Sequence, residues 1–266
     1  MTLAMFDHDG ERYLAQPCTA GPWDPDHAHG GAVAALLAHL TQAVATPIPM
    51  HPARLTVELL RPVTRVPLTA TSRLRRGGRR VHQVEVVLCD EQGREVASGS
   101  LLSIRDTTVD ELHDAGSAAD QLETAGPHEP PSALPRYTGD ELWPSGFHEA
   151  VDLRIAPGML GRPGAAEAWV ALDAEVVAGQ PPTPLERAAA AGDFGNGVSA
   201  PLAMDRFLFI NPDLTIDLDR RPTGRWVGID ARSVARPDGI GRTQTALRDQ
   251  SGSIGVALQS LVVDAI

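Results

Sequence analysis

The chain has 266 residues and a formal net charge of −11. This acidic balance argues against a general binder of nucleic acid or of anionic membranes, because attraction to phosphate dominates those affinities. All 23 Lys and Arg residues are arginine, which excludes Schiff-base chemistry, a pyridoxal phosphate linkage and the lysine of a phosphate-binding P-loop.

The first half of the chain predicts one buried helix followed by antiparallel strands. Gly30 and Gly31 lead into residues 32–45, which are apolar nearly all round, as expected for a buried helix. Four strand candidates follow with no second helix between them, which favours hairpins over parallel crossovers. These candidates span residues 53–61, 67–76, 79–90 and 95–104.

The second half predicts the same order of elements after a linker. Residues 106–146 are rich in Asp, Glu, Pro, Ser and Gly, which is typical of a linker. Thr183, Pro184 and Glu186 form the start signal of a helix, with an N-cap, a proline at the first position and a capping box. Strand candidates surround this helix at residues 147–155, 165–177, 205–219, 225–235, 239–249 and 253–264.

The two halves also share an internal repeat in which one position differs in kind. Arg61-Pro62 and Arg221-Pro222 open the two copies, an offset of 160 residues with a slip of one near Asp90. In this alignment Gly99 of the first copy corresponds to Gln259 of the second. A polar group kept in one copy alone indicates a functional site in that copy.

The sequence has few cysteines, and we find in it neither a membrane-spanning stretch nor a leader. Cys18 and Cys89 are too few for a disulfide framework or a four-ligand zinc site, and we expect both to be small buried hydrophobes. Apolar residues at 30–45 and 253–266 are too short or too interrupted to span a bilayer. With no basic-then-apolar leader at its start, the chain is expected to be cytoplasmic, without membrane insertion.

Four motifs carry a resemblance to a known family. They are His29-Gly30-Gly31 at the start of the first helix and the stretches 193–197 (DFGNG), 209–215 (FINPDLT) and 256–260 (VALQS). In this order and separation the chain resembles the medium-chain, TesB-like acyl-CoA thioesterases and their thioesterase-like relatives. The resemblance implies an α+β double hotdog fold, with two antiparallel sheets that each wrap a buried central helix. It implies an N-terminal hotdog unit at 1–105, the linker at 106–146 and a C-terminal hotdog unit at 147–266.

The catalytic set of that family is an Asp, a Thr and a Gln from the second unit. Asp193 matches the Asp, and Gln259 matches the Gln. Asn211 stands where the family has Thr, with Asp213 and Thr215 close by. Because an Asn side chain can orient water through its carbonyl or its amide, the departure leaves hydrolysis open.

Thioester hydrolysis needs a base, a held water molecule and donors for the oxygen that gains charge. Asp193 would act as the base at the end of an Ala-rich helix, with Gln259 and Asn211 holding the water. The glycine-opened helix start presents unpaired backbone N–H groups to the thioester oxygen. We therefore assign Gly30, Gly31 and the preceding His29 to oxyanion and substrate binding.

The repeat predicts one working site and one degenerate site in each chain. The degenerate site would have Gly99 in place of the Gln, and His39, Thr41 or Gln42 near its helix end. Plainer explanations stay open for the working site. Asp193 can serve as a helix-end turn residue, and Gly30-Gly31 can allow close packing of the helix on the sheet.

Two charged clusters allow further interpretations. Arg75, Arg76, Arg79 and Arg80 belong to a hairpin that is either a solvated turn or a contact for the phosphates of coenzyme A. Asp24, Asp26, His27 and His29 fall within six residues, yet their spacing matches no established metal motif. We expect no metal and no cofactor other than coenzyme A as part of the substrate.

The sequence thus predicts an acyl-CoA thioesterase that hydrolyses a fatty or related acyl thioester by Asp-activated water. Its expected partner is an acyl-CoA or an acyl-carrier thioester, and the double hotdog chains are candidates for homo-oligomers. One alternative is an acyl-CoA binding or scaffold protein without hydrolysis. Another is a hotdog dehydratase or hydratase on a thioester, which would need His29 to reach the acid from the other half.

Overall fold

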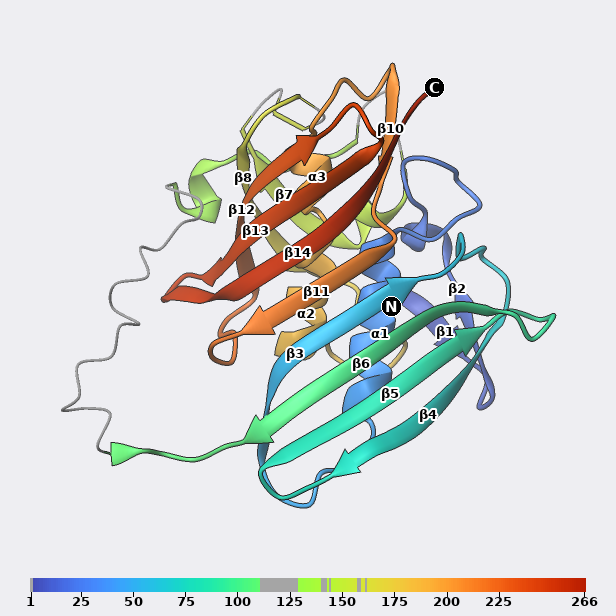
Figure 1. Cartoon of the computed structure of the whole chain (residues 1–266), viewed down its shortest axis with the longest axis vertical. Coiled ribbons are helices and arrows are strands. Elements are labelled where there is room, and N and C mark those ends of the chain that lie inside the picture. Colours follow the sequence, from blue (N-terminus) through green and yellow to red (C-terminus); the bar gives the residue numbers. More distant parts are fainter. Residues whose placement is uncertain (1, 111–128, 140–142, 144, 157–158, 161) are drawn as a thin grey trace.

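The computed structural model describes residues 2–110, 129–139, 143, 145–156, 159–160 and 162–266. One continuous sheet packs against two buried helices, α1 (Gly30–Gln42) and α2 (Pro184–Gly192), which contact each other (Figure 1). A short helix, α3 (Gly195–Val198), follows α2. The first half contributes the strands β1 (Ala4–His8), β2 (Arg12–Ala15), β3 (Met50–Leu59), β4 (Leu68–Gly77), β5 (Val81–Cys89) and β6 (Glu95–Arg105). The second half contributes β7 (Val151–Ile155), β8 (Ala166–Leu172), β9 (Glu175–Val177), β10 (Phe207–Ile210), β11 (Asp213–Leu218), β12 (Trp226–Ala235), β13 (Ile240–Asp249) and β14 (Gly252–Ala265).

The two sheets expected from the sequence are joined into one sheet of 14 strands, which corrects that prediction. The junction is an antiparallel pair in which Thr215 of β11 lies opposite Thr56 of β3. Each of these strands would otherwise be the edge of its own half, with a row of unpaired backbone groups. Pairing them satisfies those groups and fixes the halves side by side, as the neighbouring β3 and β11 arrows in Figure 1 show.

The predicted strands are confirmed within a few residues, and the differences have local causes. The candidate at 205–219 is divided into β10 and β11 at Asn211-Pro212, where proline has no N–H to continue the ladder. The candidate at 165–177 is likewise divided into β8 and β9. The hairpin of β1 and β2 was missed, because its short strands bury few side chains, chiefly Met5 and Phe6.

Both predicted helices are confirmed. Ten of the 13 residues of α1 are buried, as its apolar surface predicted. At the start of α2, Thr183 Oγ1 accepts from Glu186 N at 3.2 Å, and Glu186 Oε2 accepts from Thr183 N at 2.9 Å. Glu186 also pairs with His39 Nδ1 of α1 at 2.9 Å, which ties the helices together.

The predicted linker, residues 106–146, is described in part. Residues 111–128, 140–142 and 144 lie outside the described residues, and the unit boundaries stay predictions. Its described part is structural, since Trp143 is buried and Arg136 forms a β-bridge with Arg154 of β7. Among the described helices, none has both the length and the apolar character needed to cross a membrane.

A buried carboxylate closes the turn between β13 and β14. Asp249 is fully buried and accepts from Arg220 Nη1 and Nη2 at 2.6 and 2.7 Å. It also accepts from the backbone N–H groups of Thr223 and Ser251. Burial alone would raise the pKa of this carboxyl, but the hydrogen bonds from Arg220, Thr223 and Ser251 outweigh it and hold the pKa well below the usual range.

Replacing this carboxylate tests its contribution. Because the folded-state pKa of Asp249 is depressed, its stabilisation is present above the ordinary carboxylate range and is lost as pH falls toward the folded value. We expect Asp249→Asn to lower the free energy of unfolding by about 2 to 3 kcal/mol at neutral pH. Urea unfolding at neutral and acid pH measures this, and the gap between wild type and variant should narrow in acid. A gap that stays constant with pH would contradict this account.

Candidate active site

The candidate site lies where the end of α2 meets the start of α1. Asp193 is the C-cap of α2, and its side chain is 3% exposed. The helices approach so closely that a Cβ added at Gly30 would lie 2.7 Å from Asp193 Oδ2. Glycine is therefore required at this position by the contact itself, which supports its predicted place beside the acid.

Three side chains converge on the Asp193 carboxylate. Asn211 Nδ2 donates to Oδ1 at 2.8 Å, and Gln259 Nε2 donates to the same oxygen at 3.2 Å. On the other side, His29 Nδ1 lies 3.0 Å from Oδ2. The structure thus brings together residues from α1, β14 and the β10–β11 connection that are far apart in the sequence. A carboxylate bound in this way is held in one orientation.

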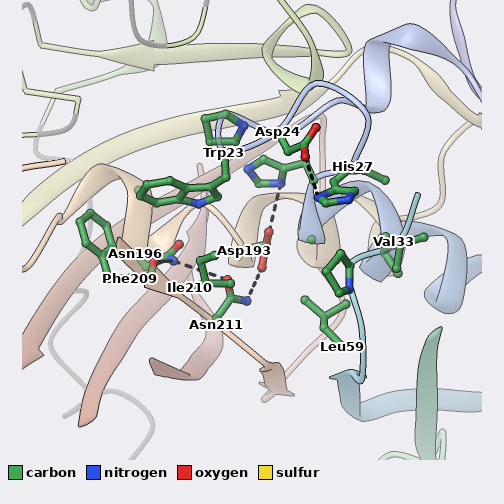
Figure 2. Close-up of a pocket in the computed structure, with 18 of the residues that line it drawn as sticks. Trp23, Asp24, His27, Val33, Leu59, Asp193, Asn196, Phe209, Ile210 and Asn211 are labelled. Carbon is green, nitrogen blue, oxygen red and sulfur yellow. Dashed lines mark hydrogen bonds and ion pairs between the residues drawn. The ribbon is translucent and has the colours of Figure 1, made fainter. Parts of the chain in front are cut away.

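Asn211 is itself held by two further contacts. Its Nδ2 also donates to the backbone carbonyl of Asp213 at 3.1 Å, and its Oδ1 lies 3.4 Å from Asn196 Nδ2 (Figure 2). The amide of Asn211 is thus engaged on both ends by protein groups. Asn196 was not singled out individually, although it lies in the DFGNG motif.

Gln259 lies behind Asp193, away from the cavity. Its Nε2 donates to both the backbone O and the Oδ1 of Asp193, and the residue is 1% exposed. Its Oε1 has no hydrogen-bond partner among the described residues. At the matching place in the first half, a Cβ on Gly99 would lie 3.0 Å from Leu37 Cβ. The asymmetry between Gly99 and Gln259 therefore marks an apolar contact in one half and support for a carboxylate in the other.

The imidazole of His29 has two neighbours that compete for one nitrogen. Gly31 N donates to His29 Nδ1 at 3.0 Å, as an N-cap bond, while Nδ1 also lies 3.0 Å from Asp193 Oδ2. One nitrogen cannot accept from Gly31 and donate to Asp193 at the same time. An Nδ1 that carries a hydrogen donates to Asp193 and leaves the Gly31 N–H without this acceptor, whereas an Nδ1 without a hydrogen accepts from Gly31. His29 thus links the acid to the helix start.

A cavity of about 340 Å³ opens in front of these groups. Aromatic side chains pack around His29, whose ring stacks on Phe147 and Trp143 at centroid distances of 4.6 and 5.5 Å. Figure 2 shows Trp23 and Phe209 on one side of Asp193, with Val33 and Leu59 on the other. The cavity therefore has largely apolar walls, with the polar groups of Asp193, His29 and Asn211 on one side. The described residues of the predicted linker contribute Tyr137 and Trp143 to its lining.

The predicted coenzyme A contacts lie elsewhere. Arg75, Arg76, Arg79 and Arg80 form the hairpin between β4 and β5, and none of them lines the cavity. The cavity meets β3 at its end, near Leu59 and Leu60, whereas this hairpin lies beside the start of β3, where Arg105 N donates to Arg80 O. Strands of this length separate the two ends by roughly 30 Å. The arginine at the cavity is instead the exposed Arg61.

The residues considered for a metal site do not converge. His27 Nδ1 lies 3.5 Å from Asp24 Oδ2, a contact that a dashed line marks in Figure 2. His29 Nδ1 instead lies 3.0 Å from Asp193 Oδ2. Asp26 is 3.6 Å from Arg65 Nη2. Within the described ranges, no group of three or more potential metal ligands is found.

The sequence matches two consecutive parts of one family. Residues 19–103 match the acyl-CoA thioesterase N-terminal domain, and residues 127–263 match the acyl-CoA thioesterase C-terminal domain. The chain belongs to the acyl-CoA thioesterase family. It is a thioester hydrolase, as its motifs predicted. A search of curated protein sequences finds no significant match.

Solved structures support the hotdog architecture of this thioesterase. A candidate thioesterase II from Thermobifida fusca YX superposes with a TM-score of 0.73 at 19% identity, covering 97% of this chain and 95% of that one. A protein described as having a hot dog fold, from Alicyclobacillus acidocaldarius, gives 0.72 at 15% identity, with 98% and 95% covered. The acyl-CoA thioesterase II TesB2 from Mycobacterium marinum gives 0.65 at 16% identity, with 89% and 91% covered. The α+β hotdog fold is thus shown.

The contact between Gly30 and Asp193 yields a direct test. In Gly30→Ala the added methyl would press on the carboxylate, so we expect kcat to fall about 100-fold, the usual effect of a displacement near 1 Å. Steady-state release of free thiol from an acyl-CoA measures this. Gly77→Ala, at the distant hairpin, is the matched control and should keep wild-type kcat. Equal activity in Gly30→Ala and wild type would show that the contact is unimportant.

Proposed function

We propose that this thioesterase hydrolyses a fatty or related acyl-CoA by attack of a water molecule that Asp193 deprotonates. The observation that best supports the proposal is a buried carboxylate at the wall of an apolar cavity, against a glycine-opened helix start. The carboxylate is a base, the helix start offers backbone donors, and the cavity accepts an acyl group.

In the proposed reaction, Asp193 takes one proton from water while the water oxygen bonds to the thioester carbonyl carbon. The carbonyl oxygen gains the negative charge. The carbon–sulfur bond then breaks, and the proton held by Asp193 passes to the departing sulfur of coenzyme A. Asn211 and Gln259 act as positioning residues, because their amides donate to Asp193 Oδ1.

His29 couples the acid to the oxyanion donors in this proposal. In this proposal His29 Nδ1 carries a hydrogen and donates it to Asp193 Oδ2, which lies 3.0 Å from the nitrogen. Because His29 keeps this hydrogen while Asp193 takes a proton from water, the Gly31 N–H stays without an acceptor on His29 as the carbonyl oxygen gains charge. The aromatic rings of Phe147 and Trp143 hold the imidazole in this position.

The cavity, which is partly open to solvent, indicates the size of the acyl group that fits inside it. At about 30 Å³ for each non-hydrogen atom, the share of a water molecule in the liquid, 340 Å³ holds about eleven atoms. Its walls include Val33, Leu59, Trp23 and Phe209, which offer no charge to a polar acyl chain. These features support an aliphatic acyl group of medium length or shorter as the substrate.

A second candidate function rests on the contact between His29 and Asp193. Hydration of an enoyl thioester pairs an acid with a histidine, and here the two lie 3.0 Å apart across the halves. A MaoC-like dehydratase superposes with a TM-score of 0.51 at 13% identity, covering 98% of each chain. At this identity the superposition shows only a similar fold. The contact between His29 and Asp193 is therefore the one observation that favours a hydratase.

The Asp193→Asn variant tests the proposal and its alternative together. It removes the base while keeping size and hydrogen bonding, so we expect kcat for thiol release to fall at least about 100-fold across a panel of acyl-CoAs. Asp217→Asn, on the exposed side of β11, should keep full activity. Full turnover in Asp193→Asn would overturn the assignment. Addition of water to an enoyl-CoA by the wild type, without thiol release, would instead favour the hydratase.

Arg61 provides a test of how coenzyme A is held. This exposed arginine at the cavity is the nearest guanidinium for the phosphates, and we expect Arg61→Ala to raise KM about tenfold with little change in kcat. The matched control is Arg79→Ala, from the hairpin that lies away from the cavity. If Arg79→Ala raises KM and Arg61→Ala does not, a second chain must bring the hairpin to the substrate.

A further inference from the structure

A second cavity of about 260 Å³ lies at the opposite end of the two helices. Here the end of α1, with Thr41 and Gln42, meets the start of α2, with Pro184 and Leu185. In the first cavity the start of α1 meets the end of α2 instead. Thus α1 starts at the first cavity and ends at the second, whereas α2 starts at the second cavity and ends at the first.

The internal repeat relates the walls of the two cavities. Arg221 and Pro222 line the second cavity, and Arg61 and Pro62, at the 160-residue offset, line the first. The same offset places His51 of the second cavity at the position of Asn211 in the first. In the first cavity Asp193 contacts His29, the N-cap of α1. At the corresponding place in the second cavity, Gln42 Nε2 donates to Oγ1 of Thr183, the N-cap of α2, at 3.0 Å. The second cavity is therefore the counterpart of the active site with different polar groups.

These groups do not support a second hydrolytic site. The described residues that line the second cavity include no Asp and no Glu. Pro184 at the start of α2 has no N–H, and the Glu186 N–H already donates to Thr183 Oγ1. Leu37 fills the place beside Gly99 that a supporting Gln would need. A carboxylate base is thus missing from the described lining of this cavity.

His82 is the strongest indication that the second cavity takes a ligand. The side chain lies on β5, opposite Ser103 of β6, and the residue is 3% exposed. Neither Nδ1 nor Nε2 has a hydrogen-bond partner in the described part of the chain. A buried polar group without a partner costs about 1 to 3 kcal/mol. In either neutral tautomer one ring nitrogen carries a hydrogen to donate, and the ring lines the cavity.

Two more polar groups line the cavity, Arg221 and His51. Arg221 lines it, and Nη2 of this arginine donates to Met50 O and Asp106 Oδ2 at 2.7 and 2.8 Å. His51 Nε2 is buried with no partner among the described residues. Burial first, and then the charge of Arg221, lower the pKa of His51, while the Leu218 carbonyl and Asp106 act in the opposite direction. An anion that enters between these groups would favour the protonated His51.

We propose that the second cavity binds a small aliphatic monocarboxylate, with its carboxylate between His82, His51 and Arg221. The remaining walls are largely apolar and fit a short alkyl chain; they are formed by Met50, Val84, Leu101, Leu185 and Leu218. At about 30 Å³ for each non-hydrogen atom, 260 Å³ holds about eight or nine atoms, the size of hexanoate. The site is a binding site without hydrolysis, and the inference does not depend on the proposed mechanism at Asp193.

Binding of hexanoate to the full chain tests the inference. Isothermal titration calorimetry of the wild type with sodium hexanoate should show saturable binding. The Gly30→Ala variant, whose change lies at the first cavity, should bind hexanoate with the same Kd. His82→Leu keeps size but removes the donor, and Arg221→Met removes the charge. Each should raise Kd about 10- to 100-fold, as expected for a lost hydrogen bond to a charged group. Arg61→Met, the repeat counterpart of Arg221→Met, is the matched control and should leave Kd unchanged.

Several outcomes would overturn the inference. They are no saturable binding, an unchanged Kd in both His82→Leu and Arg221→Met, or loss of binding in Gly30→Ala alone, which would assign hexanoate to the active site. Inorganic phosphate is the second probe. Phosphate binding as tight as hexanoate binding would contradict the role of the apolar walls. Thermal unfolding shows whether each variant is folded. If His82→Leu does not fold, the Kd of Arg221→Met alone tests the inference.

Discussion

The contact between the end of α2 and the start of α1 is the constraint on which the site depends. A carboxylate that is 3% exposed needs partners, since an unpaired charge in the interior carries a large desolvation cost. Asp193 finds them in His29, Asn211 and Gln259, one from the first half and two from the second. The approach is close enough that only glycine fits at position 30. The reactive groups are therefore placed by the packing of the two helices.

The continuous sheet fixes the relation between the helices. Because residues 54–58 of β3 pair with residues 213–217 of β11, the two halves cannot shift without breaking backbone hydrogen bonds. Duplication supplies two equivalent ends where the helices meet, and the sequence has made them unlike. One end holds an acid beside glycines; the other holds an amide and a hydroxyl, Gln42 and Thr183, beside imidazoles and a guanidinium. This difference supports the proposal of a single hydrolytic site in each chain.

Local signals predicted much of the fold. The capping box at Thr183 and Glu186 located α2, and the apolar surface of residues 32–45 identified α1 as buried. Joining of the sheets was missed because edge pairing depends on how the halves meet, which no local pattern encodes. The β1–β2 hairpin was missed because its strands are short and mostly exposed.

The sequence also identified most of the residues that meet at the candidate site. Motif order identified Asp193, Asn211, Gln259 and the glycine pair, and the structure brings all of them together. The orientation of Gln259 behind the acid depends on side-chain packing. The arginine hairpin was interpreted as a solvated turn or as a contact for coenzyme A, and strand direction places it at the far end of β3 from the cavity. Residue type indicates what a group can do; distance decides whether it takes part.

The most direct test of the central claim, that Asp193 activates water and does not itself attack the thioester, is a single turnover in water enriched in the heavy oxygen isotope. With enzyme in excess over acyl-CoA, mass spectrometry follows the label in the released acid and in the peptide that contains Asp193. Direct attack by water predicts one heavy oxygen in the acid and none in the peptide. A label on Asp193 would mean that its carboxylate had formed an anhydride with the acyl group, which would contradict the account.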